Sequence, residues 1–125
     1  VLRPGGRAVV MVYHRGLWNF YACGVARALL RGMLPGSDAL HRIAQQVTDG
    51  AIARFYSAAD WTRLAAPLFR VERCEVYGSK SEIVPLPGGP LKDRVLEWVP
   101  DALGRLLTHR LRLGCFLVAH MAKER

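Results

Sequence analysis

The sequence predicts an α/β fold, in which helices pack against a sheet. Three short stretches have the character of strands, at residues 8–12, 69–77 and 115–122. The first and last are continuous apolar runs, which is typical of strands covered on both faces. Between them lie longer stretches with apolar residues at helical spacing. This alternation of strands and helices along one chain favours the α/β class.

The first expected element, residues 1–13, is a tight turn followed by a strand. The turn contains the sequence Pro-Gly-Gly at residues 4–6, in which proline restricts the backbone and glycine permits positive φ. The apolar run at residues 8–12 predicts a parallel strand that is buried on both faces. Tyr13 and His14 follow at its carboxyl end, where ligands of open α/β sheets bind.

The second segment, residues 14–54, is expected to form a helical lid inserted after the first strand. A helix is predicted over residues 17–34, and a shorter one begins at Ser37 or Asp38. A turn is expected at residues 48–50. The residues that share the expected apolar faces are Trp18, Tyr21, Ala22, Val25, Leu29, Met33, Leu40, Ile43, Ala44 and Val47.

The third segment, residues 55–78, is expected to contain a helix and then a strand. Ser57 and Asp60 have the spacing of a capping box, which predicts that the helix begins just after Ser57. The strand is predicted at residues 69–77. Its apolar alternation slips within residues 71–74, and this slip indicates a β-bulge or an edge position.

The last two segments complete the expected order of elements. Residues 79–113 read as a polar loop followed by two helices, at residues 91–99 and 101–113, which a proline separates. Residues 114–125 contain the terminal strand and a charged end.

Residues 1–125 are expected to form a single partial domain. Three strands make a thin sheet, and a buried parallel strand needs neighbours on both sides. The chain also starts one turn before a buried strand, whereas domain termini usually lie on loosely held chain. We therefore expect a longer protein, whose N-terminal half supplies the rest of the sheet.

Composition limits the cellular compartment and the kinds of partner that we expect for this protein. The formal net charge is +8, but the basic residues are scattered, which argues against a nucleic-acid interface. The three cysteines, Cys23, Cys74 and Cys115, have no spacing of a metal site or a disulfide framework, so we expect free thiols in a reducing cytoplasm. The helix at residues 17–34 is long enough to cross a bilayer, but its arginines make lipid burial costly. We therefore expect a helix that is soluble or lies on a membrane surface.

Three segments together resemble the class I S-adenosylmethionine-dependent methyltransferases, of the type 11 kind. Residues 2–6 and the apolar strand after them resemble the turn before the family's fifth strand. Residues 55–64 with 69–71 resemble its next helix and sixth strand, and residues 114–119 its closing antiparallel seventh strand. The resemblance implies the C-terminal part of a Rossmann-like methyltransferase sheet, with inserted helices, on the side of a small-molecule methyl acceptor.

The family's cofactor site has no counterpart in this chain. That site is built on the first four strands, with a glycine-rich loop and an acidic residue for the ribose. Gly88 and Gly89 are flanked by prolines and lie in a loop, so they do not match. S-adenosylmethionine is therefore expected only in the full-length protein. No residue here is assigned as a cofactor or metal ligand, and the fragment alone is expected to be inactive.

His14 is the candidate catalytic residue, because it follows the strand whose carboxyl end faces the substrate in the family. It could act as a general base or orient the acceptor. The alternative is a loop histidine that bonds to backbone. Tyr13 is a candidate substrate-binding residue, or a packing tyrosine with a solvated hydroxyl.

Aromatic residues supply the other candidate substrate contacts. Trp18, Phe20 and Tyr21 begin the helical insert and could form a lid over a ring-bearing acceptor, or simply helix core. Phe55 and Tyr56 could close the same pocket, or act as a hydrophobic staple for the following helix.

A second function remains open from the sequence alone. The chain could be a non-catalytic α/β interaction domain, whose exposed sheet edge and apolar helices bind a partner protein or a membrane surface.

Overall fold

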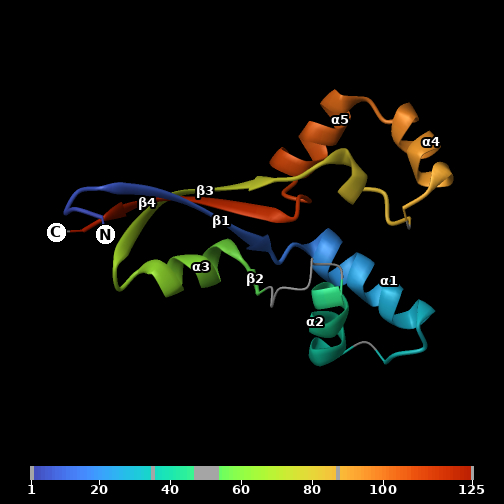
Figure 1. Ribbon diagram of the computed structural model, residues 1–125, viewed down its shortest axis with the longest axis horizontal. Helices are drawn as coiled ribbons and strands as arrows, with labels where there is room; N and C mark the ends of the chain where they lie inside the picture. Colours follow the sequence, from blue (N-terminus) through green and yellow to red (C-terminus); the bar gives the residue numbers. More distant parts are fainter. Residues whose placement is uncertain (1, 35, 47–53, 87, 125) are drawn as a thin grey trace.

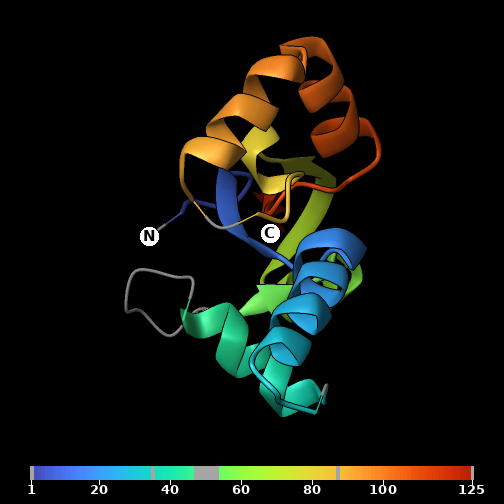
Figure 2. The same cartoon turned by 90° about the vertical axis from the view of Figure 1, so that its right-hand side faces the viewer.

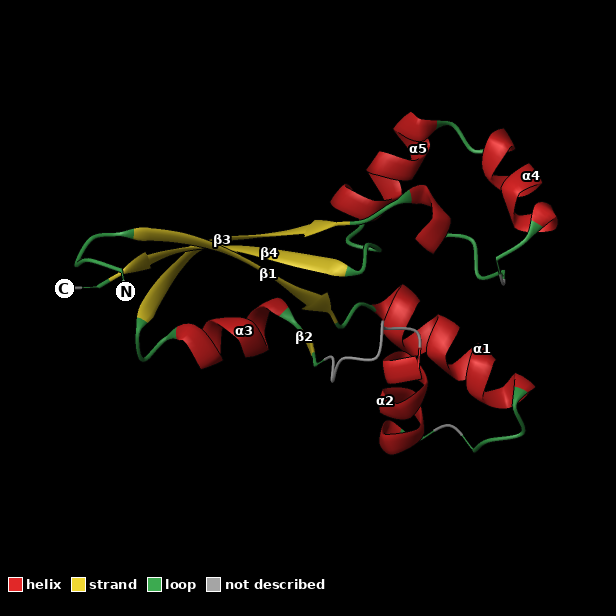
Figure 3. Cartoon of the chain, viewed as in Figure 1, coloured by secondary structure: helices red, strands yellow, loops and turns green. Residues whose placement is uncertain are grey.

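Residues 2–34, 36–46, 54–86 and 88–124 are described by a computed structural model, and within them the chain forms a four-stranded mixed sheet (Figures 1 and 3). The order of the strands is β2-β1-β4-β3. Their bounds are Arg7–His14 for β1, Phe55–Tyr56 for β2, Phe69–Tyr77 for β3 and Phe116–Lys123 for β4. β1 is parallel to β2, whereas β4 is antiparallel to both β1 and β3. The expected α/β class and the antiparallel terminal strand are confirmed.

The surroundings of β1 differ from the prediction of a parallel strand buried on both faces. β1 pairs along seven residues with antiparallel β4, and only Tyr13 and His14 pair with β2. Val9 and Met11 are each 63% exposed, while Ala8 and Val10 on the other face pack against the core. An apolar run therefore formed a strand with one open face, an arrangement that antiparallel pairing tolerates.

Helix α3 (Ala58–Ala65) covers one face of the sheet (Figure 1). Ala65 of the helix packs with Ala119 and Met121 of β4. The expected capping box starts this helix: the Asp60 amide donates to Ser57 Oγ at 3.1 Å, and the Ser57 amide donates to Asp60 Oδ2 at 3.4 Å. The predicted bulge in β3 is also confirmed, because its register against β4 shifts between Val71 and Arg73. From Ser57 to residue 78, the helix, its cap and the bulged strand thus form as the local pattern predicts.

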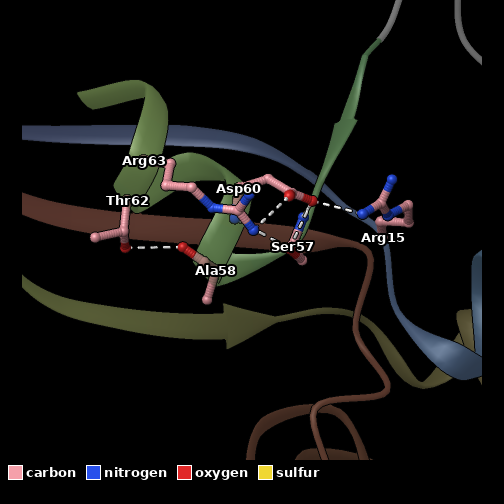
Figure 4. Close-up of polar contacts among 6 residues, drawn as sticks. All are labelled: Arg15, Ser57, Ala58, Asp60, Thr62 and Arg63. Carbon is pink, nitrogen blue, oxygen red and sulfur yellow. Dashed lines mark hydrogen bonds and ion pairs between the residues drawn. The ribbon is translucent and has the colours of Figure 1, made fainter. Parts of the chain in front are cut away.

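The same aspartate links α3 to the end of β1 (Figure 4). Arg15 donates from its guanidinium to Asp60 Oδ2 at 2.5 Å, and its amide donates to the Tyr56 carbonyl at 2.9 Å. The hydroxyl of Ser57 is the largest influence that holds the pKa of Asp60 below its usual range, and Arg15 and Arg63 add to it. These contacts hold the carboxyl ends of β1 and β2 side by side.

The helical insert begins with a π-helical segment, η1 (Leu17–Ala22), that continues into α1 (Cys23–Leu30). The helix ends before residue 34, and Gly32 follows with φ of 67°. The predicted apolar face was wrong, because Tyr21 and Leu29 are exposed while Cys23 and Ala28 are buried. A π-helical turn contains more residues than an α-helical turn and so rotates the face that follows it. No helix among the described residues is both long and apolar enough to cross a membrane.

The second helix of the insert, α2 (Ser37–Gln46), buries Leu40 and Ile43 as expected. The expected contributions of Val47 and of the turn at residues 48–50 lie outside the described residues, as does the Ala44 side chain.

The remaining helices follow β3. They are the short η2 (Lys80–Glu82), then α4 (Pro90–Trp98) and α5 (Asp101–Arg105), which continues into η3 (Leu106–Arg110). The two predicted helices of this segment are thus present, with the second ending earlier than residue 113. Figures 1 and 2 show α1 and α2 on one side and α4 and α5 on the other, all beyond the carboxyl end of β1.

Candidate functional site

A row of aromatic side chains crosses the sheet at the carboxyl end of β1. Tyr13 of β1 is in register with Phe55 of β2 and with Phe116 of β4, and Phe116 is in register with Tyr77 of β3. Residues directly opposite one another on neighbouring strands point to the same face. The Tyr13 ring centroid accordingly lies 5.3 Å from that of Phe55 and 5.6 Å from that of Phe116.

A cavity of about 360 Å³ adjoins this row. Tyr13, Phe55 and Phe116 form its floor, and Phe20 from η1 forms part of a wall. The other side consists of the loop after β3, including Val84. The volume lies within the range of sites for small molecules, about 300–1,000 Å³. The cavity therefore has the size and the apolar walls of a ligand-binding site.

Two cationic side chains line the cavity. Arg27 belongs to α1 and Lys92 to α4. Neither has a hydrogen-bond or ion-pair partner among the residues that the structure describes. The chain thus brings together two positive charges that are 65 residues apart in the sequence.

One carboxylate, Glu82, also lines the cavity, and its oxygens already accept hydrogen bonds. Oε2 accepts from the Cys115 amide at 2.9 Å, and Oε1 accepts from the Ser79 amide at 3.0 Å. Glu82 therefore holds the loop after β3 against the start of β4. Its charge is engaged by backbone rather than by Arg27 or Lys92.

Both thiols of the cavity are held in their protonated form. Burial raises the pKa of Cys23. Burial, and then the Glu82 carboxylate, raise the pKa of Cys115 to about 12. The thiolate is the nucleophilic form of cysteine, so neither residue has the surroundings of a reactive nucleophile. Within the described residues, no group of three or more His, Cys, Asp or Glu side chains is placed to hold a metal ion.

Of the residues predicted for the site, Tyr13 and Phe55 reach the cavity, whereas His14 and Tyr56 lie on the opposite face of the sheet. Successive residues of a strand point to opposite faces of the sheet, so one residue of each neighbouring pair faces the cavity and the other faces away from it. Tyr56 packs edge-to-face on Trp61 of α3, with ring centroids 5.3 Å apart.

His14 is buried and bonded to backbone. Its Nδ1–H donates to the Gly114 carbonyl at 3.1 Å. Burial lowers the pKa of His14, and nearby Arg112 acts in the same direction, while the bond to Gly114 opposes them. This is the backbone-bonded alternative that the sequence left open. A role of His14 as a general base stays a prediction.

The other predicted lid residues, Trp18 and Tyr21, lie outside the cavity lining. The indole of Trp18 donates to the Ile83 carbonyl at 3.0 Å and so joins η1 to the loop after β3. Tyr21 is 41% exposed and packs edge-to-face on Phe20, with ring centroids 5.0 Å apart. The lid aromatic that contacts the cavity is Phe20.

The cavity residues that were not predicted include Phe116 and the three charged residues Arg27, Glu82 and Lys92. Phe116 had a detectable signal, because antiparallel alignment of the first and last apolar runs places the start of one beside the end of the other. The charged residues had no such signal in the sequence, because their positions depend on how the helices before β2 and the helices after β3 pack around the cavity.

Fold and site define an α/β protein with a ligand-sized cavity at the carboxyl end of its first strand. Comparison with protein-family models, curated proteins and solved structures found no match for this chain.

Proposed function

We propose that this chain is the C-terminal, acceptor-binding part of a class I S-adenosylmethionine-dependent methyltransferase. The observation that carries the proposal is the position of the cavity, at the carboxyl end of β1 and beneath the helical insert. The family resemblance of the sequence places the methyl acceptor at that position. The antiparallel β4 adds support, because the resemblance implies an antiparallel closing strand.

In this proposal the chain contributes alignment and exclusion of water. The floor of Tyr13, Phe55 and Phe116 offers flat apolar surface to a ring-bearing acceptor. Holding the acceptor atom in line with the methyl donor lowers the entropic part of the barrier. S-adenosylmethionine, when bound, supplies the methyl group as an electrophilic sulfonium.

Among the described residues, the cavity offers no free carboxylate to the sulfonium of S-adenosylmethionine. A sulfonium is cationic, but the charges of the lining that have no partner among the described residues are those of Arg27 and Lys92. Glu82, the carboxylate of the lining, is engaged by the amides of Ser79 and Cys115. The cofactor therefore belongs, in this proposal, to the N-terminal half of the longer protein.

Isothermal titration calorimetry with S-adenosylmethionine tests the proposal. The product of the complete reading frame is expected to bind the cofactor with a Kd of about 1 µM to 1 mM, the range that is typical of KM values of enzyme substrates. Residues 1–125 alone serve as the control and are expected to show no heat of binding. Absence of binding by the complete product would overturn the proposal. Binding by residues 1–125 alone would overturn our placement of the cofactor.

A second candidate is a non-catalytic domain that binds a partner protein or a membrane surface. The face of the sheet opposite α3 favours it, because Val9 and Met11 are exposed there side by side on one strand face. The same titration separates the two candidates, since an interaction domain has no need of S-adenosylmethionine.

A further inference from the structure

The cavity beside Tyr13 has one feature that its proposed use as an acceptor site does not require: an excess of positive charge. Arg27 and Lys92 enter it from α1 and α4, and both lack a partner among the described residues. Both charges also lower the pKa of the Cys23 thiol, against the larger and opposite effect of its burial. Two like charges near apolar walls repel each other and are costly to desolvate.

The protein's own carboxylate does not balance this charge. Glu82 accepts from two backbone amides, of Ser79 and Cys115, and these bonds fix it at the junction of the loop and β4. Lining positions that carry hydroxyl or amide groups, such as Ser81 and Asn19, are neutral. A bound anion between α1 and α4 would satisfy both cations at once.

The rest of the lining selects for a ring. Tyr13, Phe20, Phe55 and Phe116 come from four different elements and converge on one space. Aromatic side chains bind flat apolar groups by stacked or edge-to-face contacts. The guanidinium of Arg27 offers paired donors that match the geometry of a carboxylate.

We propose that this cavity binds an aromatic carboxylate, with the ring on the Tyr13–Phe55–Phe116 floor and the carboxylate between Arg27 and Lys92. The further claim that this carboxylate is the methyl acceptor rests on the proposed function. Binding itself requires no cofactor. The chain alone therefore suffices to test it.

Calorimetry on residues 1–125 with three probes tests the proposal. The probe 2-naphthoate carries both ring and charge, 2-naphthamide keeps the ring without the charge, and acetate keeps the charge without the ring. We expect 2-naphthoate to bind at least about tenfold more tightly than 2-naphthamide, which is the loss typical of one charge-assisted hydrogen bond. Acetate is expected to give no measurable binding. Equal affinity for 2-naphthoate and 2-naphthamide would overturn the proposal.

Substitutions test which cationic side chains bind the carboxylate of 2-naphthoate. Arg27→Gln and Lys92→Gln should each weaken 2-naphthoate about tenfold while leaving 2-naphthamide unchanged. Arg94→Gln is the matched control, because Arg94 is an exposed cation on the same helix as Lys92 but outside the cavity lining. Phe116→Leu should weaken both ring probes. If the control weakens 2-naphthoate as much as the cavity variants do, net charge rather than the site is responsible and the proposal fails.

Unchanged affinity for 2-naphthamide shows that a variant is folded, so a lost carboxylate response cannot be attributed to unfolding. If Arg27→Gln lowers the affinity for both ring probes equally, its role is structural and the assigned carboxylate contact is wrong. Binding of 2-naphthoate without cofactor binding by the complete product would overturn the methyltransferase proposal alone. Cofactor binding without a preference for 2-naphthoate would overturn this inference alone.

Discussion

Substitution of Gly114 by alanine is expected to destabilise the protein strongly. Gly114 lies where the chain enters β4 and passes against the end of β3. A Cβ built at this position would overlap the Tyr77 carbonyl oxygen and would lie 2.5 Å from the Tyr77 carbonyl carbon and 2.8 Å from the Gly78 nitrogen. All three are backbone atoms, which cannot rotate away as a side chain can. The start of β4 would have to move.

The expected cost has two parts. Overpacking of a close contact costs about 1–3 kcal/mol. The shift also moves the Gly114 carbonyl away from the buried Nδ1–H of His14, and a hydrogen bond of this kind contributes about 0.5–1.5 kcal/mol. We expect Gly114→Ala to lower the free energy of unfolding by about 1.5–4.5 kcal/mol, the sum of the two parts.

Urea denaturation followed by far-ultraviolet circular dichroism measures this loss. Gly88→Ala is the matched control, because its added Cβ would meet no described atom within 4 Å and its φ is not positive. We expect the control to stay within about 0.5 kcal/mol of the parent. A Gly114→Ala variant that also stays within about 0.5 kcal/mol would refute the close approach of β3 and β4 at this point.

Two further predictions concern buried and capping groups. Burial lowers the pKa of His14 in the folded state, so the unfolded chain binds more protons below about pH 6.5, and the stability of the fold should fall as the pH drops through that range. Thermal melts at pH 7.5 and pH 5 should therefore show a smaller drop in melting temperature for His14→Gln than for the parent, with His41→Gln as the control. An equal drop for His14→Gln and the parent would contradict this reasoning. Ser57→Ala removes the hydroxyl that accepts from the Asp60 amide and should cost about 0.5–2 kcal/mol in urea denaturation. Ser81→Ala removes a hydroxyl that, among the described residues, is bonded to the Ser79 hydroxyl, and it should cost less; equal losses would argue against the cap.

Local elements were predicted where the signal lies within a few residues. The capping box at Ser57, the strand at residues 69–77 and its bulge depend on neighbouring side chains and on backbone geometry. The short strand β2 was missed, because two residues carry no periodic pattern and this strand exists only by pairing with β1. The buried face of α1 was wrong because a π-helical turn, invisible in the apolar spacing, precedes it.

The candidate site was predicted in part for a similar reason. Tyr13 and His14 were both placed at the carboxyl end of the first strand, and the structure has them there. Their sequence positions do not show which of the two faces the cavity. That choice depends on which side of the sheet α3 covers, and α3 packs on the side of His14 and Tyr56.

The amino-acid sequence by itself determined the α/β class, the turn and strand at the start, the cap of α3 and the presence of a terminal strand, whose antiparallel direction was expected only from the family resemblance. These features arise from backbone preferences and from apolar periodicity over short distances. Only the tertiary structure decided that Phe55, Tyr13, Phe116 and Tyr77 form one row, and that Arg27 and Lys92 line the same cavity beside it. Strand register and helix packing join residues that are tens of positions apart, and no local pattern encodes such a distance.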